Sequence, residues 1–485
     1  MTNINAQRNL TLLMDFYELT MAGGYYEENY ADKIGVFDMF FRRVPDGGGF
    51  AIAAGLEQLC QIIDQLHFTD EDIAYLRGKG CFSEGFLSYL RNFQFHCNVW
   101  AVPEGTPIFP SEPIVIVEGP AIEAQLIETL LLITINHQSL IATKTSRIVR
   151  AAQGRPVMEF GSRRAQGYDA AVLGARAAYI SGVAGTACVM ADREFNIPAL
   201  GTMAHSWVQM FQSEYEAFAA YARRYPDQCT LLVDTYSVTK SGIPNAIRVF
   251  DEVLKPLGKR PKGVRIDSGD IAYLSKKARR MLDEAGYPDC GICASNSLDE
   301  YLVRDLLLQN AKVDSFGIGE NLITSKSDPV FGGVYKLAAV KDGGVYTPKI
   351  KISETAEKMT IPHLKNLYRI YDNETGKAMA DYITMWDETL DEALPDGITL
   401  FDPVETWKQR TFTNVHARRL NIPLYENGKR VYACPPLADV RAACAAQLDT
   451  LWDEVTRFEN PHRYYVDLSQ KLWTERQKLL KELGK

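Results

Sequence analysis

Between residues 156 and 317 the sequence repeats one pattern, a short apolar run followed by a longer amphipathic stretch and then another apolar run. Repeated alternation of strand and helix predicts a parallel β-sheet, open or closed, whose connections are helices. No GxGxxG fingerprint follows any of the runs, so we favour an irregular α/β barrel over a dinucleotide-binding sheet. The predicted strands are 156–160, 198–201, 229–233, 263–266, 290–294 and 313–317.

Polar residues stand at or just after the end of every run. In a parallel α/β barrel all the strand ends face one mouth, where such enzymes build their active sites. Together the six ends supply arginines, carboxylates, a histidine and a glycine turn, a mixture that helix capping alone does not explain. The residues concerned are Arg163, Arg164, Thr202, His205, Ser206, Asp234, Arg265, Asp267, Asp270, Ser295, Asn296, Gly317 and Gly319.

Three of these residues predict a magnesium site. Asp234, Asp267 and Asp270 carry hard oxygen ligands of the kind that hold Mg²⁺ directly or through its waters. Each also follows a strand and precedes a helix, so a role as a helix N-cap is the alternative for all three, most clearly for Asp270.

The cationic and glycine residues predict a site for an anionic substrate. Arg163, Arg164 and Arg265 can bind phosphate or carboxylate oxygens with two parallel hydrogen bonds, although one of the adjacent pair is expected to face away. Gly317 and Gly319 allow backbone N–H groups to approach a phosphate closely, and a plain turn is the alternative.

His205 follows the second run and lies where a strand gives way to a helix. We expect Ser206 to cap a helix that starts at Trp207, which leaves unpaired N–H groups near the histidine. Such a turn favours bound anions. A histidine that is simply satisfied at the start of a helix is the alternative.

Net charge, cysteine content and the amino-terminal sequence limit the class of protein and its location. A formal net charge of -8 argues against a general nucleic-acid or anionic-membrane surface. Nine scattered cysteines, and the lack of a basic-then-apolar leader, predict a cytoplasmic protein with reduced thiols. We expect an α+β amino-terminal domain over residues 1–120, completed by part of 335–385, the barrel over 121–334, and a mainly helical extension over 386–485.

Five motifs, in this order, resemble those of the nicotinate phosphoribosyltransferases. The resemblance continues to the carboxyl-terminal segment 460–466 (NPHRYYV), which is similar to the tail of the longer bacterial-type members. The five motifs are 15–21 (DFYELTM), 159–164 (EFGSRR), 201–206 (GTMAHS), 264–270 (VRIDSGD) and 315–319 (SFGIG).

The resemblance implies the irregular barrel of type II phosphoribosyltransferases and a homodimer with shared active sites. It also implies transfer of phosphoribosyl from phosphoribosyl pyrophosphate to nicotinate, coupled to ATP hydrolysis with Mg²⁺. His205 would be phosphorylated by ATP. Phe160 and Tyr17 of the partner subunit would enclose the pyridine ring, while Thr202 and Arg265 would hold nicotinate.

Thr360 would contact phosphoribosyl pyrophosphate, but His363 stands where many relatives have glycine, which bears on the backbone around Thr360. A nicotinamide-using relative is the alternative function. It places an aspartate against the amide, whereas the matching loop here, residues 182–188, has no acidic residue, so we favour nicotinate. A metal-dependent lyase or aldolase and a non-catalytic pyridine-nucleotide sensor are the other classes.

Overall fold

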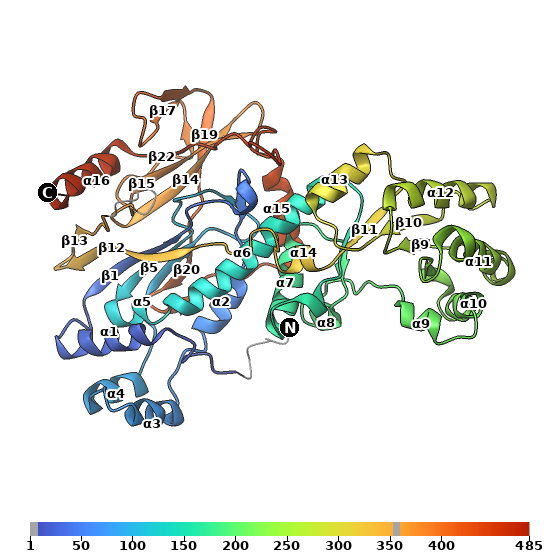
Figure 1. Ribbon diagram of the computed structural model, residues 1–485. Coiled ribbons are helices and arrows are strands. Elements are labelled where there is room, and N and C mark those ends of the chain that lie inside the picture. The colour runs from blue at the N-terminus through green and yellow to red at the C-terminus, as the bar shows by residue number, and fades with distance from the viewer. Residues whose placement is uncertain (1–7, 353–358, 485) are drawn as a thin grey trace. The chain divides into compact units, whose positions relative to one another are not determined.

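The computed structural model describes residues 8–352 and 359–484, and the chain divides into two compact units. Unit 1 comprises residues 1–143 and 330–485, and unit 2 comprises residues 144–329. In Figure 1 the segment that forms unit 2 is coloured from turquoise through green to yellow. The three-part division expected from the sequence stays a prediction.

Unit 2 is built on a six-stranded sheet in the order β7-β6-β11-β10-β9-β8, and every neighbouring pair is parallel. This is the parallel sheet that the alternating pattern predicts. Within residues 144–329, no strand pairing joins the two edge strands, so the barrel is open between them. The strands are β6 (Val157–Glu159), β7 (Gly185–Thr186), β8 (Thr230–Leu232), β9 (Gly263–Ile266), β10 (Gly291–Ala294) and β11 (Ser315–Ile318).

The amphipathic stretches form the helices between these strands. Val264 and Ile292 of the sheet and Leu282 of α12 are fully buried in one core, and each contributes about 1.5–3 kcal/mol by leaving water. Figure 1 shows α10, α11 and α12 stacked beside the sheet. The helices are α7 (Tyr168–Ile180), α8 (Val189–Phe195), α9 (His205–Gln209), α10 (Glu214–Arg224), α11 (Ile243–Val249), α12 (Ile271–Glu284), α13 (Glu300–Leu308) and α14 (Glu320–Ile323), with short turns η2 (Ser162–Arg164), η3 (Pro226–Gln228), η4 (Val238–Gly242), η5 (Phe250–Leu254) and η6 (Lys255–Leu257).

One predicted strand is wrong and one was missed. Residues 198–201 do not form a strand; Ala199 makes an isolated parallel bridge with Thr186. Thr186 N donates to Pro198 O and Leu200 N donates to Thr186 O, but Pro198 has no N–H with which to extend the ladder. The strand that enters the sheet instead is β7, which the glycine-rich loop 182–188 concealed.

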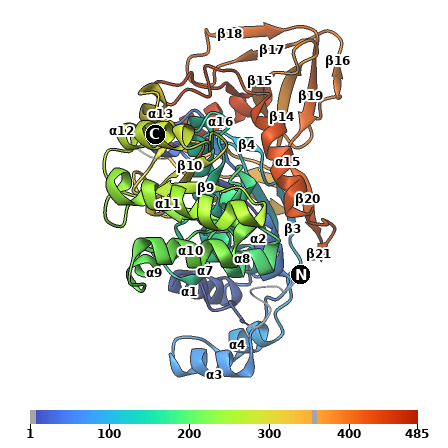
Figure 2. The same cartoon turned by 90° about the vertical axis from the view of Figure 1, so that its right-hand side faces the viewer.

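Unit 1 contains two larger sheets. The seven-stranded sheet has the order β13-β12-β1-β5-β3-β20-β21, and the five-stranded sheet has the order β16-β19-β14-β15-β22. Figure 2 shows β16 to β19 together on one side of unit 1. The strands are β1 (Ile34–Phe40), β2 (Ala51–Ile52), β3 (Asn98–Ala101), β4 (Pro107–Ile108), β5 (Val115–Pro120), β12 (Val334–Asp342), β13 (Val345–Pro348), β14 (Lys365–Asp372), β15 (Ala378–Met385), β16 (Ala393–Leu394), β17 (Ile398–Phe401), β18 (Gln409–Phe412), β19 (Val415–Arg419), β20 (Ile422–Glu426), β21 (Lys429–Arg430) and β22 (Val466–Leu468).

Helices complete unit 1, and the predicted helical carboxyl-terminal end is present as α15 and α16. The stretch before it, residues 393–430, forms short strands instead. Within the described residues one continuous stretch, Ala121–Ala151, is long and apolar enough to cross a membrane, but 67% of its most apolar window is buried, as in the core helix of a globular protein. The helices are α1 (Phe16–Glu27), α2 (Leu56–Ile63), α3 (Asp70–Gly78), α4 (Glu84–Arg91), α5 (Ala121–Gln125), α6 (Glu128–Ala151, which continues into unit 2), α15 (Leu437–Leu448) and α16 (Gln470–Leu483), with the turn η1 (Pro45–Gly47).

Candidate active site

The carboxyl ends of the strands of unit 2 bring four predicted residues into one hydrogen-bonded group around Arg265. Arg265 Nε donates to Ser295 Oγ at 2.8 Å, Nη1 donates to Thr202 Oγ1 at 3.1 Å, and Nη2 donates to Asp267 Oδ1 at 2.8 Å. The Arg265 side chain is 16% exposed. Three elements, β9, β10 and the loop before α9, therefore fix one partly buried cation at the rim.

Asp267 is held in its charged form within this group. Burial raises the pKa of Asp267, but the hydrogen bond from Ser295 and the charge of Arg265 outweigh burial and hold that pKa below its ordinary value. The rim therefore carries an ion pair whose anion stays ionised, rather than a free cation.

His205 is the first residue of α9 and faces the same group. Its Nδ1 lies 3.1 Å from Thr235 Oγ1, and its Nε2 lies 3.8 Å from Asp267 Oδ2. The imidazole is 40% exposed, so it is both oriented and accessible. Sequence reasoning did not single out Thr235, because one hydroxyl after a strand resembles an ordinary cap.

The expected capping role of Ser206 is wrong. The N-cap of α9 is Ala204, which makes no side-chain cap, and the helix starts at His205 rather than at Trp207. Ser206 is exposed in the first turn of the helix. The N–H groups of this turn consequently lack a side-chain cap, a condition that favours an anion.

The two other aspartates, Asp234 and Asp270, accept hydrogen bonds from the backbone at the carboxyl ends of the strands. Asp234 Oδ2 accepts from Asp267 N at 3.0 Å and from Ser268 Oγ at 2.5 Å, while its Oδ1 is buried without a hydrogen-bond partner. Asp270 caps α12 by accepting from Tyr273 N at 2.9 Å, the alternative anticipated for it. In the described part of the chain no group of three or more His, Cys, Asp and Glu residues could hold a metal ion.

A pocket of about 270 Å³ opens beside Arg265. Phe160 forms one wall, with its ring centroid 5.7 Å from Arg265 Cζ. A Cβ on Gly317 would lie 2.6 Å from two ring carbons of Phe160, so only glycine lets the ring pack there. The volume lies just under the lower end for drug-sized ligands, which suits a small single-ring ligand. The lining residues are Phe160, Ser162, Arg163, Ala187, Gly201, Thr202 and Arg265.

A buried carboxyl that sequence reasoning missed, Glu159, links the two loops beside this pocket. Its Oε1 accepts from Gly161 N, and its Oε2 accepts from Thr186 Oγ1 at 2.5 Å. Burial raises the pKa of Glu159. An acidic residue inside the otherwise apolar run 156–160 was the available signal. Loop 182–188 has no acidic residue of its own, but the Glu159 carboxylate of the neighbouring strand β6 accepts a hydrogen bond from Thr186 in this loop.

The other predicted residues lie apart from this hydrogen-bonded group. Arg163 is exposed on η2 but lines the pocket, Arg164 is exposed beside it, and Asn296 is exposed after β10 with a φ of 91°. Gly319 precedes α14 as its N-cap residue. Their roles in binding stay predictions.

Tyr17 and Thr360 belong to unit 1, and their predicted roles are untested. Tyr17 is 43% exposed on α1. Thr360 is buried, and its Oγ1 accepts from Lys351 N at 3.2 Å. His363 has a φ of 76°, a conformation that favours glycine.

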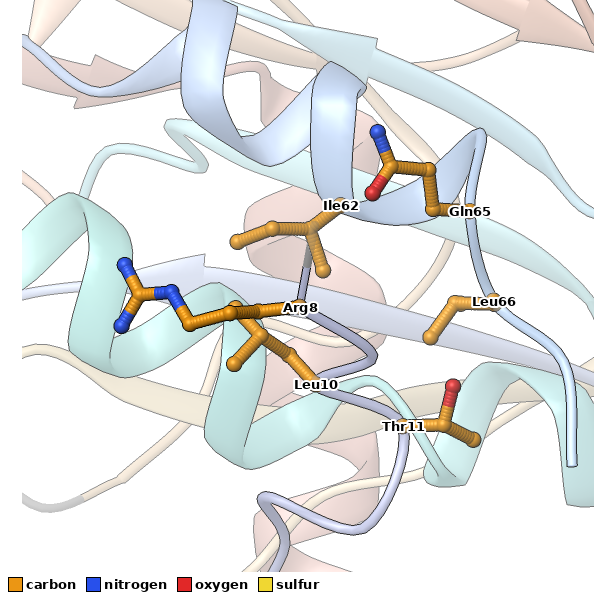
Figure 3. Close-up of a pocket in the computed structure, with 6 residues that line it drawn as sticks. All are labelled: Arg8, Leu10, Thr11, Ile62, Gln65 and Leu66. Atoms are coloured by element: carbon orange, nitrogen blue, oxygen red, sulfur yellow. The ribbon is translucent and has the colours of Figure 1, made fainter. Parts of the chain in front are cut away.

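Unit 1 also contains a much smaller pocket near the start of the described chain (Figure 3). Its cavity of about 10 Å³ has room for about one water molecule, so it cannot hold a substrate. Figure 3 shows the six lining residues, Arg8, Leu10, Thr11, Ile62, Gln65 and Leu66.

Sequence profiles and curated proteins resemble this chain over most of its length. Profiles for the nicotinate phosphoribosyltransferase (NAPRTase) N-terminal domain, family and C-terminal domain match residues 12–136, 156–388 and 364–476. The nicotinate phosphoribosyltransferase of Bacillus subtilis is 42% identical over 477 residues, which cover 98% of this chain and 96% of that protein. Nicotinate phosphoribosyltransferase pncB2 of Mycobacterium tuberculosis is 39% identical over 465 residues, covering 95% and 92%.

Solved structures agree with the fold. Human nicotinic acid phosphoribosyltransferase superposes with a TM-score of 0.85 at 29% identity, covering 96% of this chain and 99% of that chain. Nicotinate-nucleotide pyrophosphorylase from Pyrococcus furiosus gives 0.70 at 22% identity, covering 93% and 97%, and shows a shared fold. The predicted irregular α/β architecture is confirmed.

Proposed function

The chain belongs to the nicotinate phosphoribosyltransferase family, and from this premise we propose how its rim residues perform the family's reaction. The protein is a nicotinate phosphoribosyltransferase, an enzyme of NAD biosynthesis that converts nicotinate and phosphoribosyl pyrophosphate into nicotinate mononucleotide and pyrophosphate. Family membership favours this transfer over the lyase, aldolase and sensor alternatives. The observation that best supports the proposed site is the Phe160 pocket with Arg265 fixed at its edge.

Nicotinate carries a carboxylate, and its pocket must supply donors and cations. Arg163 and Arg265 line the pocket, and the exposed guanidinium of Arg163 can donate to both carboxylate oxygens. Thr202 adds a hydroxyl beside Arg265, and the pyridine ring packs on Phe160. A nicotinamide pocket would instead need an acceptor for the amide N–H groups. Comparison of kcat/KM for the acid and the amide tests this assignment, and a preference for the amide would overturn it.

The transfer step requires orientation rather than a base. The ring nitrogen of nicotinate has a free lone pair, which attacks the anomeric carbon of the ribose as the bond to pyrophosphate breaks. The protein therefore acts by aligning the two substrates and stabilising the charge on departing pyrophosphate. We assign Ser295, Asn296, Gly317 and Gly319 of unit 2 to the binding of phosphoribosyl pyrophosphate, and the role of Thr360 stays a prediction from the family resemblance.

Mg²⁺ fits the rim as an ion shared with the substrate. It is commonly held by one or two carboxylates together with substrate phosphates and water. The unpartnered Oδ1 of Asp234 and the carboxylate of Asp267 are the best placed donors. When bound, the ion would neutralise charge on pyrophosphate. Asp270 remains a candidate through its second oxygen.

We assign ATP coupling to His205. A neutral imidazole nitrogen attacks the γ-phosphorus, the bond to the bridging oxygen breaks, and ADP leaves. The contact with Thr235 orients the ring for this attack, and the phosphate group adds negative charge next to Asp267. Incubation with γ-labelled ATP and mapping of the acid-labile label would test the assignment.

His205→Ala should lose coupling to ATP but keep a slow, ATP-independent transfer, because the nicotinate pocket does not depend on the imidazole. His205→Gln serves as the matched control, since it keeps a polar side chain that can contact Thr235. If either variant hydrolyses ATP in step with product as the wild type does, the assignment of His205 is wrong.

A homodimer and a cytoplasmic location complete the proposal. Phe16, Tyr17 and Met21 are exposed on α1, and an exposed apolar group of this kind suits an interface at which Tyr17 of the partner subunit reaches the pyridine ring. None of the nine cysteines, all of which lie in the described residues, forms a disulfide, and reduced thiols are typical of a cytoplasmic protein. Sedimentation of the wild type and of Phe16→Ser tests the dimer.

A further inference from the structure

Arg430 of β21 holds the sulfur of Cys434 in a fixed position within unit 1. Its Nη2 donates to Cys434 Sγ at 3.0 Å, and its Nη1 donates to Asp64 Oδ2 at 2.9 Å. Asp64 is the C-cap residue of α2, and its Oδ1 accepts from Tyr425 Oη at 2.6 Å. The guanidinium is thus anchored by a carboxylate on one side and presents its charge to a thiol on the other.

A second thiol contacts Cys434. Cys60 lies on α2, one turn before Asp64, and is fully buried. Cys434 packs against the core cluster that contains Cys60, and each thiol shifts the pKa of the other. Cys434 is only partly buried, so one sulfur of the pair can meet a small solute while the other cannot.

The surroundings make the two thiols chemically different. The hydrogen bond from Cys60 and the charge of Arg430 lower the pKa of Cys434, against burial and the carboxylates Glu104 and Glu57. The same hydrogen bond and burial raise the pKa of Cys60. Because the thiolate is the nucleophile, Cys434 is the reactive member and Cys60 keeps its proton.

Four other cysteines have the opposite character. Burial raises the pKa of each of them, so their thiolate fraction is small and they are shielded from solutes. They are Cys97, Cys229, Cys290 and Cys293. The combination of a partly exposed thiolate with an adjacent resolving thiol is typical of a cysteine that reacts with peroxide.

We propose that Cys434 is a peroxide-reactive site and that Cys60 resolves its oxidised form into a disulfide within the chain. The Cys434 thiolate attacks a hydroperoxide oxygen, the O–O bond breaks, and the departing alkoxide or hydroxide takes a proton from water. As the Cys60 thiol passes its proton to the sulfenic hydroxyl, the Cys60 sulfur attacks the Cys434 sulfur, the S–O bond of the sulfenic acid breaks, and water leaves. One peroxide is reduced and two thiols are oxidised.

The disulfide would join the segment after β21 to α2. It closes a loop from residue 60 to residue 434, and a cross-link over so long a loop restricts the unfolded chain strongly. Oxidised protein is therefore expected to unfold at a higher temperature than reduced protein, and a thiol reductant should reverse the change.

Hydrogen peroxide at increasing concentration, followed by alkylation of the remaining thiols and peptide mass spectrometry, tests the proposal on the full chain. The expected result is a Cys60–Cys434 linked peptide that forms before the exposed Cys81 is oxidised. Cys60→Ser should stop at the sulfenic acid, which a dione probe traps at Cys434. Cys434→Ser should leave Cys60 alkylated.

Arg430→Met tests whether the positive charge of the guanidinium makes Cys434 reactive. Loss of the guanidinium raises the pKa of Cys434, so the linked peptide should form several-fold more slowly, while Arg457→Met, which removes an exposed arginine of the same unit, should leave the rate unchanged. The proposal is overturned if Cys434 reacts no faster than Cys81, if Cys60 pairs with another thiol, or if Arg430→Met leaves the rate unaltered.

Discussion

Thr186→Val removes one hydroxyl while keeping the shape of the side chain, and so tests whether the bond to Glu159 stabilises the loops of the pocket. The hydroxyl donates to Glu159 Oε2 at 2.5 Å and accepts from Cys188 N at 2.9 Å. A hydrogen bond to a charged group contributes about 1.5–3 kcal/mol and a neutral one about 0.5–1.5 kcal/mol. Because Cys188 is half-buried, water replaces part of the second bond, and we expect a loss of about 2–3 kcal/mol in the free energy of unfolding.

Urea unfolding of the wild type, Thr186→Val and Thr186→Ser measures this loss. Serine keeps the donor and the acceptor and loses only a methyl group, so its cost is expected near 1 kcal/mol or below. At about 2–4 °C per kcal/mol for a unit of this size, valine should lower the Tm by about 4–12 °C. Compared with the wild type, valine replaces only the hydroxyl by a methyl group, and serine measures the separate cost of losing the existing methyl group.

Activity provides the second measurement. Ala187 lines the pocket and its N–H donates to Glu159 O at 2.8 Å, so a displaced loop should raise the KM for nicotinate more than it lowers kcat. A double-mutant cycle with Glu159→Gln should give a coupling energy of about 1–2 kcal/mol. If valine costs no more than serine, or if the two substitutions are additive, Glu159 does not stabilise the loop through Thr186.

Three further predictions concern single sites. Gly317→Ala should raise the KM for nicotinate roughly tenfold with less change in stability, because its Cβ would lie 2.6 Å from the ring of Phe160 and force that ring into the pocket. Asp270→Ala should lower stability by about 1 kcal/mol through loss of the α12 cap, whereas Asp270→Asn should preserve stability and raise the Mg²⁺ requirement only if the carboxylate binds the metal. Burial raises the pKa of Glu18 to about 7, so its contribution to stability is complete at low pH and falls by up to about 3 kcal/mol as the pH rises from about 5 to 8; urea unfolding should show a smaller fall in Glu18→Gln.

The repeated pattern of apolar runs predicted five of the six strands of unit 2, because strands buried on both faces read as continuous apolar segments. It failed at residues 198–201 and at β7. β7 pairs through two residues and Ala199 makes a single bridge with Thr186, and both contacts depend on hydrogen bonds between segments rather than on local composition. Short strands of this kind carry too little side-chain pattern to be recognised in one sequence.

The residues of the candidate site likewise include some that the sequence predicted and one that it did not. Arg265, Asp267, Ser295 and Thr202 were found because charged or hydroxyl residues at strand ends stand out against apolar runs. Glu159 was not, because a carboxyl inside a strand reveals its role only when its donors, Gly161 N and the Thr186 hydroxyl, are placed around it. The geometry of a buried polar group is a tertiary property, and sequence spacing does not encode it.

The raised pKa of Glu159 has a consequence for the choice between nicotinate and nicotinamide. Glu159 precedes Phe160, the wall of the pocket, so a carboxylate ligand placed there adds a negative charge near a buried carboxyl and favours its protonated form. By linkage, the affinity for nicotinate should then rise as the pH falls through the pKa of Glu159, while the affinity for the neutral amide should change less. Binding titrations of both ligands across this range, repeated with Glu159→Gln, measure the difference. If the ratio of the two affinities has the same pH dependence in Glu159→Gln as in the wild type, the buried carboxyl takes no part in discrimination, and Arg265 and Arg163 alone account for it.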